Sequence, residues 1–235
     1  MKKFVTTLLA LLLTVALAVG FTAYKDNDED EGYNEVTEEV WKSALNLFGG
    51  DPDKIKTDDL NLTVKFDYEG YGRHGEVTTK YDYANKTYSL SGDDVEYAWV
   101  DGNDLFFYEE DTYGGVTYKF KHILDSTYLE FVAEYLSYTQ LGMALGAHNI
   151  INKYSACTYN ADLGCYIYSF DDTEEDIETG EDVDFHVDIK IYFSGEKVVK
   201  SDYLVTGGFN ETVKETFTYG STTVTIPDEV KNYQG

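Results

Sequence analysis

Apolar and polar residues alternate over most of this chain, and no other feature constrains its fold as strongly. Successive side chains of a β-strand point to opposite faces of a sheet, so a period of two indicates strands with one buried and one solvated face. Further runs lie at 62–68, 95–99 and 116–120, with turn residues about every ten positions between runs. The pattern predicts a large curved antiparallel sheet. Its clearest run covers 183–193, with apolar members Val183, Phe185, Val187, Ile189, Ile191 and Phe193.

The first 20 residues have the features of an export signal. Lys2 and Lys3 precede an apolar stretch from Leu8 to Val19, and small residues lie at its end. A bilayer needs roughly 20 apolar residues, so we expect a cleaved signal peptide at 1–20 and no transmembrane segment after its removal. No cysteine lies near the exit, so acylation is not expected. The prediction is a secreted or cell-surface protein.

The mature chain is expected to begin with an acidic flexible leader at 21–33, where charged and polar residues predominate. A single domain should follow at 34–235. In it, Asn34 can cap a first helix, and the capping box Thr127-x-x-Glu130 opens a second helical stretch. The expected fold class is α+β: a strongly curved antiparallel sheet of about 11–12 strands, forming an incomplete barrel, with helices packed in its concavity.

This order of elements, with three short segments, resembles the LolA-like and LppX-like exported proteins of Gram-positive bacteria. The segments are Trp41–Leu45 in the first helix, Asn61–Val64 at the first strand and Phe217–Pro227 near the end. Members of this lipoprotein-sorting superfamily form a half-barrel plugged by helices, and the best-known ones carry lipids or lipoproteins in the hollow. The resemblance therefore implies the same half-barrel and a lipid-like ligand. Many relatives have an acylated cysteine that this chain lacks.

Charge limits the partners of the chain. It has 44 acidic and 18 basic residues, and its formal net charge is −26. Nucleic acid and anionic membrane surfaces repel such a chain. An acidic surface is typical of a soluble exported protein, and cationic partners are the electrostatic alternative. We expect a monomer that does not bind nucleic acid.

Two cysteines, Cys157 and Cys165, flank a segment with turn residues. A three-residue loop at Asn160 to Asp162 would place them directly opposite each other, and an exported chain meets oxidising conditions. We therefore expect a disulfide between them. No nearby histidine or second cysteine pair completes a four-ligand set, so no metal is predicted here.

The sequence lacks the motifs of the common catalytic classes, such as Gly-x-Ser-x-Gly, His-Glu-x-x-His and the phosphate-binding loop. We therefore expect a non-catalytic binding protein without a cofactor. The first interpretation is a carrier that holds an apolar, lipid-like ligand between the helical stretch and the sheet. Its expected ligand-binding residues are Leu129, Val132, Leu136 and Met143 on the helical stretch, and Val187, Ile189 and Ile191 on the sheet.

The alternative is a cell-surface interaction or sensing module that binds protein or glycan through exposed aromatic residues. The chain has 22 tyrosines, some in alternating runs such as 81–83 and 166–168. Tyrosine also favours strands, and the sheet is the preferred explanation of these runs. A cavity of roughly several hundred Å³ in the concavity would favour the carrier, and a packed concavity would favour the interaction module.

Overall fold

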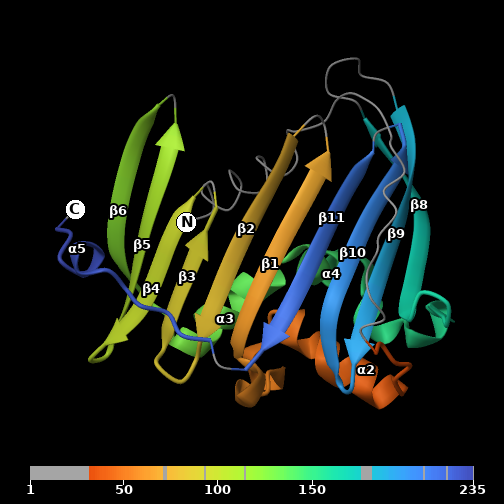
Figure 1. Cartoon of the computed structure of the whole chain (residues 1–235), viewed down its shortest axis with the longest axis horizontal. Coiled ribbons are helices and arrows are strands. Elements are labelled where there is room, and N and C mark those ends of the chain that lie inside the picture. Colours follow the sequence, from red (N-terminus) through yellow and green to blue (C-terminus); the bar gives the residue numbers. More distant parts are fainter. Residues whose placement is uncertain are drawn as a thin grey trace.

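Eleven strands form one antiparallel sheet in the part of the chain that the structure, a computed structural model, describes (Figure 1). The described residues are 32–70, 73–92, 94–113, 115–175, 182–208, 210–220 and 222–234. The strands are β1 (Asn61–Gly70), β2 (Arg73–Asp82), β3 (Thr87–Ser91), β4 (Val95–Asp101), β5 (Asp104–Tyr113), β6 (Val116–Leu124), β7 (Thr158–Asn160), β8 (Cys165–Glu175), β9 (Asp182–Ser194), β10 (Lys197–Gly207) and β11 (Glu211–Tyr219).

The strand order is β6-β5-β4-β3-β2-β1-β11-β10-β9-β8-β7, and the two outermost strands do not pair with each other. The sheet is therefore open. Within β1–β6, and again within β7–β11, each strand pairs with the strand that follows it in the sequence. The runs join where β1 pairs with β11, from Leu62 opposite Tyr219 to Gly70 opposite Glu211. The first and last strands of the domain thus lie together at the centre of the sheet.

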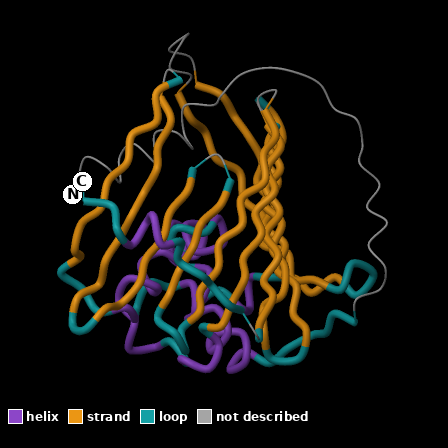
Figure 2. The backbone as a smooth tube through the Cα atoms, turned by 60° about the vertical axis from the view of Figure 1, so that its left-hand side comes forward, coloured by secondary structure: helices purple, strands orange, loops and turns teal. Residues whose placement is uncertain are grey.

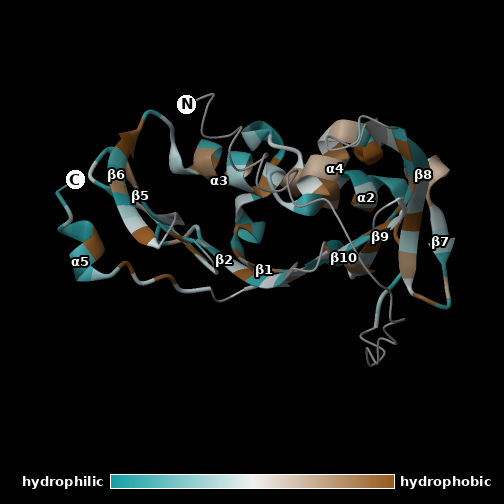
Figure 3. Ribbon diagram, turned by 90° about the horizontal axis from the view of Figure 1, so that it is seen from above, coloured by the Kyte–Doolittle hydropathy of each residue, from teal (hydrophilic) through white to brown (hydrophobic). Residues whose placement is uncertain are grey.

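Three helices lie on one face of the sheet, which bows around them (Figure 3). They are α2 (Glu38–Leu45), α3 (Tyr128–Ser137) and α4 (Gln140–His148), with short 3₁₀ turns η1 (Asn46–Phe48), η2 (Pro52–Lys54), η3 (Thr57–Asp59), η4 (Ile150–Asn152) and η5 (Tyr154–Ala156). We call this the concave face. The helices cover one end of the strands, and the other end extends beyond them (Figure 2). No helix of the described residues is long and apolar enough to cross a membrane.

Local sequence explains where the helices begin. Thr127 and Glu130 form the predicted capping box at the start of α3. At α2 the cap is Thr37, whose side chain accepts from the backbone N–H of Val40, and not the predicted Asn34. The side chain of Asn34 instead accepts from the backbone N–H of Gly195, in the turn between β9 and β10, at 2.7 Å.

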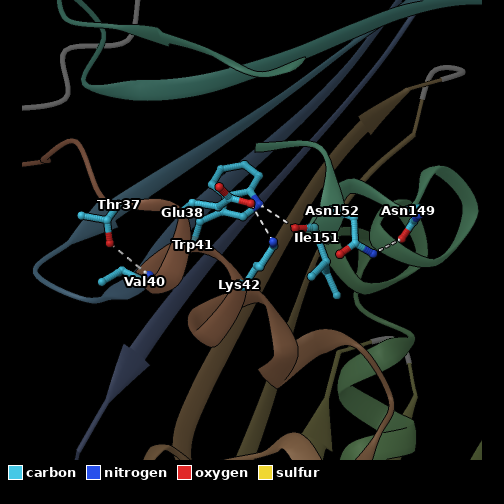
Figure 4. A network of polar contacts seen from close by, with 8 residues as sticks. All are labelled: Thr37, Glu38, Val40, Trp41, Lys42, Asn149, Ile151 and Asn152. Carbon is cyan, nitrogen blue, oxygen red and sulfur yellow. Dashed lines mark hydrogen bonds and ion pairs between the residues drawn. The ribbon is translucent and has the colours of Figure 1, made fainter. Parts of the chain in front are cut away.

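Helix α2 is fixed to the sheet by Trp41, which is fully buried. Its indole N–H donates to the carbonyl of Ile151 at 3.2 Å (Figure 4). Its ring lies 5.1 Å from that of Tyr166 and 5.7 Å from that of Phe193. Such aromatic contacts add about 0.5–1.5 kcal/mol each beyond the burial of apolar area.

The predicted signal peptide, and the predicted leader up to residue 31, lie outside the described residues. Gly32 and Tyr33, the last residues of that leader, are described. The ring of Tyr33 packs on Tyr192 at 4.9 Å.

Apolar residues form two clusters, one on each side of the sheet. The main core fills the space between the helices and the concave face. A smaller cluster lies on the opposite, convex face, where the segment 222–227 and the short helix α5 (Asp228–Lys231) cover β4 and β5. Its buried members are Trp99, Tyr108, Val224, Ile226 and Val230.

A buried carboxylate joins the sheet to α4. Glu215 lies on the concave side of β11 and is 1% exposed. It accepts from the backbone N–H groups of Gln140 (2.7 Å) and Leu141 (2.9 Å) in the first turn of α4, and from the Ser201 hydroxyl (2.8 Å). Burial raises the pKa of Glu215, and the bonds from Leu141, Ser201 and Gln140 oppose this effect. The N-terminal end of a helix favours a carboxylate.

Glu215→Ala should lower the free energy of unfolding by about 3–5 kcal/mol, because two buried donors and one partly buried donor lose their acceptor. Glu211→Ala, four residues away on the same face of β11, is the matched control and should cost less than about 1 kcal/mol. Urea denaturation of both variants measures the difference. Equal losses would contradict the role given to Glu215.

Candidate functional site

An acidic and aromatic surface lies on the concave face of β3–β6, beside α3. In register, Glu96 on β4 is opposite Glu109 on β5, and Glu109 is opposite Phe120 on β6. Asp111 and Tyr118 form the next row away from the helices, and Phe107 and His122 form the next row toward them. We call this the wing surface, and its members are Glu96, Glu109, Asp111, Val116, Tyr118, Phe120 and His122; the buried Tyr88 lies beneath it.

Two tight turns set this register. Gly102, between β4 and β5, has a φ of +63°, and Gly115, between β5 and β6, has a φ of +79°. Glycine adopts such angles without the steric cost of a Cβ atom. A slip of one residue would move the carboxylates of Glu96 and Glu109 to the convex face.

The pKa of Glu96 is raised to about 7. Burial is the largest cause, and the nearby carboxylates of Glu109 and Asp94 contribute to the same rise. The Tyr88 hydroxyl donates to Glu96 Oε2 at 3.0 Å and opposes the rise. Tyr88 itself is fully buried and packs its ring against Tyr135 of α3 at 5.1 Å.

The pKa values of residues near Glu96 are also shifted, by burial and by the surrounding charges. Burial raises the pKa of Glu109, His122 lowers it, and Asp111 raises it. The pKa of Tyr135 is also raised, first by burial and then by Glu96 and Glu109. Glu96 and Glu109 are like charges placed directly opposite each other, which is unfavourable unless one of them is protonated.

Chemically, this surface offers carboxylate acceptors and aromatic faces. Among the described residues, no group of three or more His, Cys, Asp or Glu side chains is arranged to hold a metal ion. Strongly shifted pKa values mark candidate functional sites, although structural pairs shift them as well. The arrangement suits binding and proton storage.

Beyond the helices, the wing surface ends in exposed apolar residues. Val116, Tyr118 and Phe120 of β6 are 52%, 48% and 44% exposed. They alternate along the strand and therefore share the concave face. Ile123, at 57% exposed, lies on the convex face of the same strand. We call Val116, Tyr118 and Phe120 the β6 row.

Six of the seven residues predicted to line a ligand cavity lie in the main core or pack against it. Five of them are at most 1% exposed, and Leu129 packs against the same cluster. Met143 on α4 is partly buried. Helices and sheet therefore meet here through direct packing. The five buried residues are Val132, Leu136, Val187, Ile189 and Ile191.

Two surface hollows lie elsewhere. One of about 420 Å³ lies beside the start of α3 and is lined by Asn103, Leu124 and Glu130, among others. Another of about 520 Å³ lies near η3 and includes Ser43 and Lys197. None of the seven predicted ligand-binding residues lines either hollow.

The predicted pairing of Cys157 with Cys165 is wrong in this structure, where both cysteines are free. The hairpin loop covers 161–164, with Gly164 at a φ of +67°, so Cys165 lies opposite Asn160. Cys157 packs with the main core on the concave side. Cys165 lies beside Tyr192, its partner across β8 and β9, on the convex side. The two thiols therefore lie on opposite faces of the sheet.

The tyrosine runs do not form an exposed platform. Tyr81 and Tyr166 are buried. Tyr83 and Tyr168 are partly buried and pack against the main core. The β6 row and the pair of Glu96 with Glu109 were not singled out from the sequence. Their only signal there was the alternation of 95–99 and 116–120, which does not identify the partner across the hairpin.

Comparison with known proteins adds no assignment: no protein-family model and no curated protein sequence matches this chain.

Glu96→Gln should remove a pH dependence of stability. The pKa of Glu96 is raised in the folded state, so the folded chain binds more protons between about pH 4.5 and 7 and loses stability as pH rises through that range. The loss should reach about 3 kcal/mol at most. Glu96→Gln should therefore be more stable than the wild type at pH 8 and similar to it at pH 4, as measured by urea denaturation.

Glu110→Gln is the control for this prediction. Glu110 lies on β5 next to Glu109, and bonds from Tyr108 and Lys119 lower its pKa. Removing its charge should therefore give no gain in stability at pH 8. An unchanged pH profile in Glu96→Gln would show that Glu96 is ionised across the range.

Proposed function

We propose that this chain is a non-catalytic binding protein that acts outside the cell and contacts an apolar or amphipathic ligand with the β6 row. The observation that carries this proposal is the exposure of Val116, Tyr118 and Phe120 side by side on an outermost strand. Grouped exposed apolar residues mark interaction sites more often than single ones do. The acidic members of the wing surface lie next to the row and offer hydrogen-bond acceptors to the same ligand.

The strength of such a contact can be estimated. Fully burying one large apolar side chain contributes about 1.5–3 kcal/mol. The three residues are about half exposed, so covering them would contribute on the order of 3 kcal/mol. Micromolar affinity needs about 8 kcal/mol. The ligand must therefore gain further contacts beyond the β6 row.

The interaction module is favoured over the carrier because of where the apolar residues lie. A carrier needs space beside Val132, Leu136 and Ile189, and these residues are buried members of one packed cluster. An apolar chain could enter there only by displacing α3 or α4. Relation to the LolA-like and LppX-like proteins, export and removal of residues 1–20 remain predictions from the sequence, and they place the β6 row outside the cell.

Titration with N-phenyl-1-naphthylamine, a neutral apolar dye that fluoresces when bound, tests the proposal. Saturable binding is expected, and Phe120→Ser should weaken it about tenfold because the variant removes one of the two aromatic rings of the row. Ile123→Ser is the matched control, since it removes an apolar side chain that is also exposed, at 57% against 44% for Phe120, from the opposite face of the same strand.

Dye binding that is equal in the two variants would contradict the proposal. If Val132→Trp abolished dye binding while Phe120→Ser left it intact, the ligand would lie in the interior and the carrier would be correct. The melting temperature of each variant separates loss of binding from loss of fold.

A further inference from the structure

We propose that β6 accepts an extended polypeptide as a further strand of the sheet, and that this polypeptide alternates apolar with acidic residues. The inference rests on the proposed function, because it takes the β6 row as the contact surface. It adds the class of partner and the backbone contacts that the row alone does not provide.

The position of β6 permits strand addition. The strand has nine residues, is the outermost strand of the sheet, and pairs with β5 on its inner side. The outer edge of such a strand offers N–H and C=O groups to an incoming chain. The carbonyl of Lys119 already receives a hydrogen bond from the Tyr233 hydroxyl at 3.1 Å, so an incoming strand would have to share this acceptor or displace Tyr233.

The side chains of β6 define what the incoming strand should contain. Its concave side would face the β6 row and so requires apolar residues. Its convex side would face Thr117, Lys119 and Lys121, and β6 contains no carboxylate. Acidic residues on that side would meet opposite charge, as favourable cross-strand pairs do. This preference for acidic residues applies only at β6, because the chain as a whole is strongly acidic.

Both lysines already contact groups on β4, β5 and the C-terminal segment. Lys119 forms an ion pair with Glu110 at 2.9 Å. The Lys121 ammonium donates to the carbonyls of Lys231 and Tyr233, and it lies over the rings of Trp99 and Phe106 at 5.5 and 5.4 Å. Because these contacts already order the lysines, less side-chain entropy is lost when a partner binds.

A second copy of this chain fits the edge poorly. Antiparallel pairing of two β6 strands with full overlap is centred on Phe120 and places Lys119 of each copy opposite Lys121 of the other. Like charges directly opposite are destabilising. Both copies also carry a formal net charge of −26. The occupant is therefore a different polypeptide.

A fluorescein-labelled, capped peptide of nine residues, the length of β6, that alternates valine with glutamate tests the inference by fluorescence anisotropy. Saturable binding is expected, and its affinity should fall as salt increases. A peptide with lysine in place of glutamate should bind about tenfold more weakly. N-methylation of alternate residues along one edge of the peptide should abolish binding, because it removes the peptide N–H groups that would donate backbone hydrogen bonds to β6.

Variants of the protein locate the site. Lys119→Gln with Lys121→Gln should weaken glutamate-peptide binding roughly fivefold. Lys65→Gln with Lys80→Gln makes the same charge change at exposed lysines of β1 and β2 and should leave it unchanged. Phe120→Ser should weaken it, and Ile123→Ser should have a smaller effect.

Three results would overturn the inference: equal binding of the glutamate and lysine peptides, full binding of the N-methylated peptide, or glutamate-peptide binding that is insensitive to Phe120→Ser. Dye binding that still depends on Phe120 would in each case leave the proposed function standing. A concentration-dependent dimer in sedimentation that Phe120→Ser abolishes would assign the edge to a second copy instead.

Discussion

The bond between the Glu215 carboxylate and the first turn of α4 connects the two layers of this protein, and the rest of the structure depends on it. Three donors converge on a side chain that points from the middle of the sheet into the interior. The donors of Gln140 and Leu141 fix α4 against β11, and the Ser201 donor links β10 to the same carboxylate. Helix α3 follows because only Tyr138 and Thr139 separate the two helices. The helices are thereby placed over one end of the strands and not the other.

This placement separates a packed region from an open one. Where α3 and α4 lie, apolar residues of both layers are completely buried, including Leu136 and Ile191. Past the end of α3, the same face of the sheet carries Glu96 and Glu109 and then the exposed β6 row. A polypeptide or other ligand can reach this second region without moving a helix. This physical division of the concave face is the reason why we propose binding at the edge and not in the interior.

Features that depend on neighbours in sequence could be predicted. Alternation predicted the strands, and the spacing of Thr127 and Glu130 predicted the start of α3. Alternation identifies two faces but not which one the helices cover: the apolar run of β4, which ends at Trp99, faces the convex side and is covered by the C-terminal segment.

Features that depend on register or long-range contacts could not be predicted. The pairing of Glu96 with Glu109 requires the exact turn at Gly102. A loop of four residues instead of three was enough to remove Cys165 from the position opposite Cys157. The acceptor role of Glu215 joins residues more than 70 positions apart.

Hydrogen exchange followed by mass spectrometry tests most directly whether the concave face is divided into a packed and an open region. The amides of α3 and α4 should exchange as slowly as those of the central strands β1 and β11, while the amides of β6 should exchange much faster. Faster exchange in α3 and α4 than in β6 would contradict the account, because it would show that the helices open and expose the interior.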